Sequence, residues 1–257
     1  MDRAPDITVV IAAHNEERRL GRCLQSVAAA AAALDDAPAH AVEIIVVDNC
    51  STDGTAAVAA AAGASVVGER ALGAVNAKAA GVAAARAPLV AILDADSVCP
   101  PDWLAKIARA FAADARLVGL SGPARYAGAR AWVYVVMWLW YGFWKTVQAV
   151  AGTAYYAVGT NVAFRRDAFV RAGGFDTKVL VGGDEVGLFR RLRRVGPTRY
   201  TDALWVETDP RRTEVGFFRF FFGTVLLHYV LNYPIYRLTG RSFLKRYPPG
   251  STLLPRQ

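Results

Sequence analysis

The stretch Leu89-Val90-Ala91-Ile92-Leu93-Asp94-Ala95-Asp96-Ser97 decides how this chain folds. An unbroken apolar run follows Pro88 and stops on two carboxylates that are separated by one residue. A run this short, next to a proline, is typical of a buried strand rather than a helix. Carboxylates just past such a strand are costly in a dry core. At the edge of a sheet, where α/β folds bind ligands, the same pair can hold a hard cation.

Apolar runs alternate with helical patterns on both sides of this stretch. We predict strands at residues 7–13, 43–47, 64–67, 89–93 and 117–122. Helices are predicted at residues 15–34, 55–63, 72–86 and 102–113. The second half is predicted to hold a strand at 155–166, a turn at 173–176, a helix at 182–196 and short strands around Tyr200 and Trp205. This alternation predicts an α/β fold with a doubly wound, mostly parallel sheet and helices on both faces.

Polar residues collect where three of the predicted strands end. His14 and Glu16 follow the first strand, Asp48 follows the second, and Asp94 and Asp96 follow the strand at 89–93. Because the carboxyl ends of parallel strands share one edge of a sheet, we expect these side chains to line a single cleft.

The length of 257 residues suits one large domain with an appendage. We expect a main domain at 1–209, divided into halves at 1–122 and 123–209, and a basic aromatic helical segment at 210–257. No segment reaches the roughly 18 uncharged apolar residues of a membrane-spanning helix. The first residues lack a signal-peptide pattern and the cysteines lack a metal-binding spacing, so we expect free thiols and a cytoplasmic location.

The net charge of +8 is concentrated late in the chain. Residues 184–257 hold 13 Lys and Arg against 6 Asp and Glu, whereas residues 1–183 are nearly balanced. Two interpretations are open: a solvated basic surface, or a surface that meets anionic lipid or phosphate. No nucleic-acid-binding motif accompanies the basic residues, so we expect no nucleic-acid partner.

Two aromatic segments distinguish the second half. Residues 131–144 are apolar throughout and hold four of the six tryptophans. Residues 215–236 are apolar and aromatic but include Arg219 and Pro234, which argue against a spanning helix. Because Trp and Tyr favour the boundary between apolar and wet surroundings, both segments are candidates for contact with a membrane surface. Ordinary packing against the protein is the alternative.

The ordered motifs of residues 6–200 resemble the family 2 glycosyltransferases of GT-A fold. The resemblance is carried by Ala12-Ala13-His14-Asn15-Glu16-Glu17, Val47-Asp48-Asn49-Cys50-Ser51-Thr52-Asp53-Gly54-Thr55, Lys78, Asp94-Ala95-Asp96, Gly159-Thr160-Asn161, Gly173-Gly174-Phe175-Asp176, and Asp184-Glu185 with Arg191-Leu192 and Gly196. One Asp-X-Asp is a weak signal, but the ordered set is specific. It implies a GT-A enzyme whose donor is a nucleoside diphosphate sugar.

The resemblance also implies which residues hold the donor. The residues that would contact the nucleotide sugar are Ala12, His14, Glu16, Asp48, Lys78, Asp94, Asn161, Arg211 and Arg212. The first three would line the nucleoside, Asp48 would face the base and Asp94 the ribose. Lys78 would lie near the base or phosphates, and the two arginines near the leaving diphosphate. Asp96 would bind Mn2+ or Mg2+, a hard cation that neutralises the diphosphate.

Asp184 and Glu185 are the candidate catalytic pair. Alignment on Arg191-Leu192 puts Glu185 where the family's base lies, but many relatives read Glu-Asp here, so the division of labour stays open. Gly187 stands where relatives carry a further carboxylate. The base would take a proton from an acceptor hydroxyl as it attacks the anomeric carbon, with inversion. The processive motif Gln-X-X-Arg-Trp is missing, which implies a single transfer.

We expect the acceptor to belong to cell-surface glycan or glycolipid synthesis. The two aromatic segments and the basic end of the chain favour an acceptor that is lipid-linked or membrane-proximal, at the inner face of the plasma membrane. A sugar nucleotidyltransferase is a disfavoured alternative, because residues 12–16 contain no Gly, Lys or Arg. A degenerate glycosyltransferase-like interaction module is a second alternative.

Some of the single residues also have structural alternatives. Lys78 could be a solvated helix residue, and Arg211 a solvated helix start. Asn15 and Asp53 are expected to cap helices.

Overall fold

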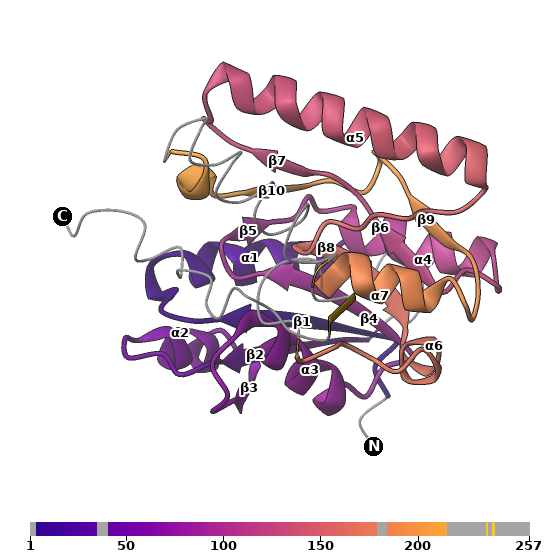
Figure 1. The fold of residues 1–257 in the computed structure, drawn as a ribbon. Helices are drawn as coiled ribbons and strands as arrows, with labels where there is room; N and C mark the ends of the chain where they lie inside the picture. Colours follow the sequence, from indigo (N-terminus) through magenta and orange to yellow (C-terminus); the bar gives the residue numbers. More distant parts are fainter. Residues whose placement is uncertain (1–3, 35–40, 179–183, 215–234, 236–237, 240–257) are drawn as a thin grey trace.

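A seven-stranded sheet forms the centre of the computed structural model, which describes residues 4–34, 41–178, 184–214, 235 and 238–239 (Figure 1). Its strands lie in the order β3 (Ser65–Gly68), β2 (Val42–Asp48), β1 (Ile7–Ala13), β4 (Leu89–Asp94), β8 (Asn161–Arg165), β6 (Gly119–Ser121) and β9 (Thr198–Tyr200). Of these seven strands, β8 alone runs against its neighbours, and the other pairings are parallel. The prediction of a mostly parallel sheet is confirmed.

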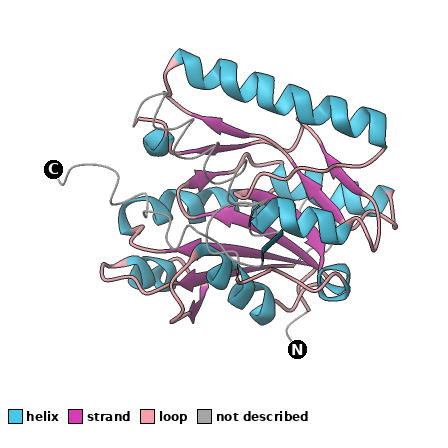
Figure 2. Cartoon of the chain, viewed as in Figure 1, coloured by secondary structure: helices cyan, strands magenta, loops and turns pink. Residues whose placement is uncertain are grey.

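Helices cover both faces of this sheet, as predicted (Figure 2). They are α1 (Glu17–Ala32), α2 (Thr55–Ala61), α3 (Ala74–Ala84), α4 (Trp103–Ala113), α6 (Arg166–Arg171) and α7 (Asp184–Leu192). Helix α3 packs on β1 and β2, while α1 contacts α4. The close approach of α3 requires Gly81, because a Cβ there would press into the side chains of Val10 and Val47.

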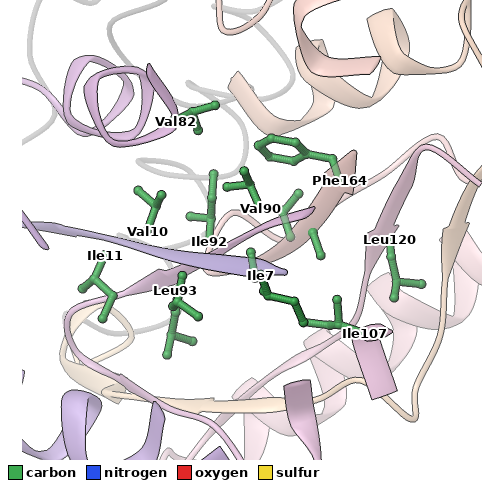
Figure 3. Close-up of a cluster of buried hydrophobic side chains, with 14 of the residues drawn as sticks. Ile7, Val10, Ile11, Val82, Val90, Ile92, Leu93, Ile107, Leu120 and Phe164 are labelled. Atoms are coloured by element: carbon green, nitrogen blue, oxygen red, sulfur yellow. The ribbon is translucent and has the colours of Figure 1, made fainter. Parts of the chain in front are cut away.

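The central strands send alternate side chains into two apolar layers (Figure 3). Val10 of β1 and Ile92 of β4 point toward Val82 of α3, while Ile11 and Leu93 point to the opposite layer. All five side chains are almost completely buried. Because both faces of the sheet are covered at its centre, polar side chains of β1 and β4 reach solvent only where these strands end, as expected for a doubly wound fold.

The loops after β1 and β2 hold each other through two side chains. Asn15 has a φ of 56° and does not cap α1, so that prediction is wrong; Glu16 is the N-cap residue. The Asn15 Oδ1 instead accepts a hydrogen bond from the Thr52 N–H at 2.8 Å. Asp53 accepts from the Thr55 N–H at 3.0 Å and the Glu17 N–H at 3.3 Å, but Gly54 is the N-cap residue of α2, so the predicted cap is displaced by one residue.

A small second sheet contains β5 (Ser97–Val98), β10 (Val206–Thr208) and β7 (Ala124–Tyr126), in that order. Helix α5 (Ala131–Ala151) runs along the outside of the molecule, beyond β7 (Figure 1). Within the described ranges, no helix combines the length and apolar character needed to cross a bilayer. The aromatic segment predicted at 215–236 lies outside the described residues apart from Ile235.

Candidate active site

The polar edge expected from the sequence forms at the carboxyl ends of β1, β2 and β4. In the sheet register Ala12 lies opposite Asp94, and Asp48 ends β2 on the other side of β1. His14 follows β1, and its Nδ1–H donates to the Asn49 carbonyl at 2.7 Å. These residues are partly exposed apart from Asn49, so the edge offers a polar surface directly above the core.

Lys78 of α3 is buried at the centre of this edge, surrounded by carboxylates. Its Nζ donates to Glu185 Oε1 at 3.1 Å and to the Gly159 carbonyl at 3.2 Å. The same nitrogen lies 3.8 Å from Asp184 Oδ2 and 3.9 Å from Asp94 Oδ1. The alternative of a solvated helix residue is therefore wrong. Lys78 joins Asp94 on β4 to the carboxylate pair on α7.

The carboxylates of α7 differ in their protonation. Burial, together with the neighbouring Glu185 charge, raises the pKa of Asp184 to about 8. Burial also acts to raise the pKa of Glu185, but the Lys78 ammonium and hydrogen bonds outweigh it and hold this pKa below its usual value. Near neutral pH Asp184 is protonated and Glu185 is ionised. Glu185 is thus the member of the pair that can accept a proton.

We expect Asp184→Asn to gain stability relative to the wild type as pH rises from 5 to 8. Asp184 loses its proton near pH 4 in the unfolded chain but only near pH 8 in the folded protein. Between these values a rise in pH favours the unfolded state, so the free energy of unfolding of the wild type falls. A neutral amide does not ionise. Urea unfolding of both proteins at pH 5, 7 and 9 measures the effect. A stability difference that is constant with pH would contradict the protonation assigned to Asp184.

Gly159 fixes where the Glu185 carboxylate lies. A Cβ at residue 159 would overlap Glu185 Oε1 and lie 2.5 Å from its carboxyl carbon, so only glycine leaves room for the side chain in this position. The strand predicted at 155–166 accordingly begins later, at Asn161, and residue 159 belongs to a turn. The motif Gly159-Thr160-Asn161 is part of the family resemblance, but the sequence alone does not indicate that its glycine makes room for the Glu185 side chain.

We expect Gly159→Ala to lower turnover by about 10²-fold, because a base displaced by roughly 1 Å loses its alignment with the substrate. The fold should survive, since the overlapped atoms belong to the end of a flexible side chain. Gly142→Ala on α5 is the matched control, because its Cβ would meet nothing within 4 Å. Steady-state kinetics and thermal unfolding of both variants provide the comparison. Equal turnover in the two would show that the Gly159 contact is irrelevant to the reaction.

Arg211 forms a second buried cation at the same edge, between two carboxylates. Its Nη2 donates to Asp96 Oδ2 at 2.8 Å, and its Nη1 donates to Glu16 Oε2 at 3.1 Å. Arg211 Nη2 also pairs with Glu16 Oε1. Arg211 is therefore not a solvated helix start, as one interpretation of the sequence had it. The side chain of Arg212 lies outside the part that the structure describes.

Asp209 holds Arg211 in this position and was not identified from the sequence. Its Oδ1 accepts from the Arg211 N–H at 2.9 Å and caps the 3-10 helix η1 (Pro210–Arg212). Its Oδ2 accepts from Arg19 Nε on α1 at 2.6 Å. The signal that could have found it is an Asp before a Pro at the start of a short helix.

Asp94 and Asp96 fit a divalent cation by the chemistry of their ligands. Asp94 ends β4 and Asp96 lies in the turn that follows, and hard cations take oxygen ligands such as these carboxylates. No group of three or more His, Cys, Asp or Glu side chains suited to a metal exists among the residues with described positions. Mg2+ is commonly held by one or two carboxylates, with phosphate oxygens and waters completing its shell. The loop thus suits a cation that arrives with a phosphate-bearing ligand.

Asn161 belongs to the core rather than to the cleft. Its Oδ1 accepts from Trp103 Nε1 at 3.0 Å, and its Nδ2 donates to the Leu204 carbonyl at 2.5 Å. The residue is fully buried. Its amide therefore has no group left for a ligand, and the expectation that it contacts the donor is corrected. Its role is to join β8, α4 and the chain before β10.

Comparison with solved structures defines the class of protein. A mannosyltransferase from Pyrobaculum calidifontis, solved with GDP-Man and Mn2+, has a TM-score of 0.68 at 20% identity, covering 93% of this chain and 66% of its own. Glucosyl-3-phosphoglycerate synthase from Mycobacterium tuberculosis, solved with Mn2+, UDP and glucosyl-3-phosphoglycerate, has a TM-score of 0.55 at 21% identity, covering 79% and 71%. The fold is that of the GT-A glycosyltransferases.

Residues 8–172 match the model of glycosyl transferase family 2, and the chain belongs to that family. Over 122 residues it is 37% identical to the succinoglycan biosynthesis protein ExoO of Rhizobium meliloti, covering 46% of this chain and 33% of that one. An uncharacterized glycosyltransferase of Mycobacterium tuberculosis is 39% identical over 129 residues, covering 50% and 53%. The chain thus spans about a third to a half of these relatives. Membership of this family argues against the nucleotidyltransferase alternative.

Proposed function

We propose that this protein transfers one sugar from a nucleoside diphosphate sugar to an acceptor hydroxyl with inversion at the anomeric carbon. The observation that carries the proposal is the Lys78 ion-pair network, which joins Asp94 at the end of β4 to Glu185 on α7. A single buried cation thereby links the strand end suited to a donor with an ionised carboxylate suited to accept a proton.

The donor side of the proposed site is the edge formed by β1, β2 and β4. Ala12, His14 and Glu16 would line the nucleoside, Asp48 the base and Asp94 the ribose. Asp96, with Asp94 beside it, would hold Mn2+ or Mg2+, which supplies electrostatic neutralisation of the diphosphate when bound. Arg211, and Arg212 next to it, would contact the leaving diphosphate.

Glu185 would act as the catalytic base. It would accept the proton of the acceptor hydroxyl while that oxygen forms its bond to the anomeric carbon and the bond to the diphosphate breaks. Because attack comes from the face opposite the leaving group, an α-linked donor would give a β-linked product. Lys78 and Gly159 would hold the Glu185 carboxylate in place, and a protonated Asp184 would keep a second negative charge away from it.

The proposed donor is a hexose nucleotide, and the proposed acceptor is a glycan or glycolipid intermediate near a membrane. Solved structures of the same fold contain GDP-Man or UDP-glucose, and one relative is named for succinoglycan biosynthesis. These names describe those proteins, and they motivate the choice of probes here. A peripheral position at the cytoplasmic face of the plasma membrane suits such an acceptor.

Donor binding tests the proposal without knowledge of the acceptor. A thermal-shift screen of UDP- and GDP-sugars with Mn2+ should find one donor that raises the stability, by about 2.7 kcal/mol at a hundredfold excess over its Kd. Asp96→Asn should lose this stabilisation, whereas Asp167→Asn on the exposed surface of α6 should keep it. Failure of every nucleotide sugar to stabilise the wild type would favour a degenerate interaction module instead.

We expect Arg211→Lys to raise the KM for the donor by about tenfold, because a lysine cannot reproduce the two-sided guanidinium contacts. A lysine keeps the positive charge that Glu16 and Asp96 require, so the fold should tolerate it better than alanine. Donor-dependent kinetics and urea unfolding of wild type and variant separate these effects. An unchanged donor KM would remove Arg211 from the donor site.

A further inference from the structure

Helix α5 presents an apolar face to solvent. Val135, Trp138, Leu139 and Phe143 are 57%, 74%, 58% and 57% exposed, respectively. Their spacing of three and four residues places them on one stripe of the helix. A surface helix normally carries polar residues on its outer face, and a large exposed apolar patch marks an interaction site.

The inner side of α5 is fixed to the protein by specific contacts. Gln148 donates from Nε2 to the Tyr200 carbonyl at 2.9 Å and accepts from the Tyr200 N–H at 2.6 Å. The Tyr141 hydroxyl donates to the Ala124 carbonyl at 3.2 Å. With a polar residue turned inward and satisfied, the helix cannot rotate to hide its aromatic stripe without leaving buried groups unpaired. The exposure of the stripe is therefore built into the fold.

The segment that contains the stripe is basic, and Asp202 is the acidic residue that pairs with α5 among the described contacts. Residues 115–166 contain no Asp or Glu but six Lys and Arg. Arg130 precedes α5 and is exposed, while Lys145 in the helix pairs with Asp202 at 2.6 Å. The Thr146 hydroxyl, close to the stripe, donates a hydrogen bond to the Gly142 carbonyl at 3.0 Å. Its proton is therefore already bonded within the helix and does not need a water molecule as acceptor.

We propose that the outer face of α5 docks on an anionic phospholipid bilayer. Trp, Leu and Phe on one side of a surface-lying helix, with cations beside them, match the apolar and anionic layers of a membrane surface. A second copy of the chain fits less well, because a symmetric contact would bring together two surfaces that each carry more basic than acidic residues. The helix lies in the interface plane, with its stripe below the headgroups.

This contact would hold the protein against a membrane that carries a lipid-attached acceptor, a consequence that rests on the proposed function. Trp144 of α5 stacks on Tyr156 with 5.4 Å between ring centroids. The chain then runs from Tyr156 directly to Gly159, which packs against Glu185. Helix α5 is therefore connected to the proposed base through Trp144, Tyr156 and Gly159.

Vesicle co-sedimentation of the full chain tests the docking surface. Vesicles of phosphatidylcholine with about one third phosphatidylglycerol should bind the wild type, and binding should weaken on neutral vesicles and in high salt. The triple variant Trp138→Ser, Leu139→Ser, Phe143→Ser should lower the partition coefficient at least about tenfold. Leu72→Ser with Val170→Ser, which removes equally exposed apolar side chains elsewhere, should bind like the wild type.

Two further measurements keep the outcomes distinct. The triple variant should unfold at the wild-type temperature or higher and should retain wild-type donor binding in vesicle-free buffer, because no substituted residue lies in the proposed site. Equal vesicle binding by the wild type and the triple variant would overturn the docking proposal. A wild-type dimer that the triple variant abolishes, without vesicle binding, would also overturn it in favour of a self-contact. Failure of the wild type to bind any donor would instead contradict the proposed function.

Discussion

Glu185→Gln is expected to lower turnover by about 10²–10⁴-fold, the usual contribution of a positioned general base. The amide fills the same space beside Gly159 but cannot take a proton from an acceptor hydroxyl. Lys78 lowers the pKa of the Glu185 carboxyl, so the proposed base is ionised at neutral pH. Donor binding should change little, because the proposed donor side lies on β1, β2 and β4 while Glu185 lies on α7.

The comparison requires turnover and donor affinity from the same preparations. Asp167→Asn serves as the control, because its carboxylate is exposed and pairs only with Arg171 one turn along α6. The activity of the wild type should also fall at low pH, where Glu185 takes up a proton. The apparent pKa of this loss of activity should lie below the usual pKa of glutamate. Turnover of Glu185→Gln within a few fold of the wild type would assign the base elsewhere, with Asp184 as the first candidate.

Lys78→Met is expected to destabilise the protein by about 3–5 kcal/mol near neutral pH. The variant removes a buried cation and leaves Asp94, Asp184 and Glu185 around an apolar side chain. Burial alone would lower the pKa of Lys78, but the surrounding carboxylates outweigh burial and raise it, so the lysine is charged whenever the protein is folded. The loss should shrink at pH 5, where the carboxylates that lack a cationic partner in the variant can be neutralised by protonation.

Lys106→Met is the matched control for this experiment. Lys106 pairs with Asp102 at 2.9 Å on α4, but the aspartate is half exposed, and such pairs contribute about 0.5 kcal/mol. Urea unfolding at pH 5 and 7 of the wild type and both variants gives the two differences. A cost below about 1 kcal/mol for Lys78→Met would mean that the network around Lys78 opens to water in solution.

The central fold was predictable because its signals are local. The apolar run from Leu89 to Leu93 and the turn residues after it define β4 without reference to any distant segment. The rule that parallel strands share a carboxyl edge then brings Asp48 and Asp94 together, and the register agrees. Short strands such as β5 were missed, because a pair of residues carries no periodic pattern.

The interior of the site was not predictable because it depends on contacts between distant residues. Nothing near Lys78 in the sequence indicates that a carboxylate 107 residues later accepts its hydrogen bond. Asn161 shows the opposite error, since a motif position implied a donor contact while packing against Trp103 removed it. The sequence also does not indicate which side of α5 faces solvent, because its apolar pattern is the same whether the apolar face packs inward or outward.

The most direct test of the central claim is the configuration of the sugar released when water replaces the acceptor. Proton NMR can follow UDP-α-glucose and GDP-α-mannose with the full chain and Mn2+, before the free sugar equilibrates. The account requires that the β-anomer be released first from the accepted donor, and that Glu185→Gln abolish this release while still binding the donor. First release of the α-anomer, or undiminished release by Glu185→Gln, would contradict a single displacement with Glu185 as its base.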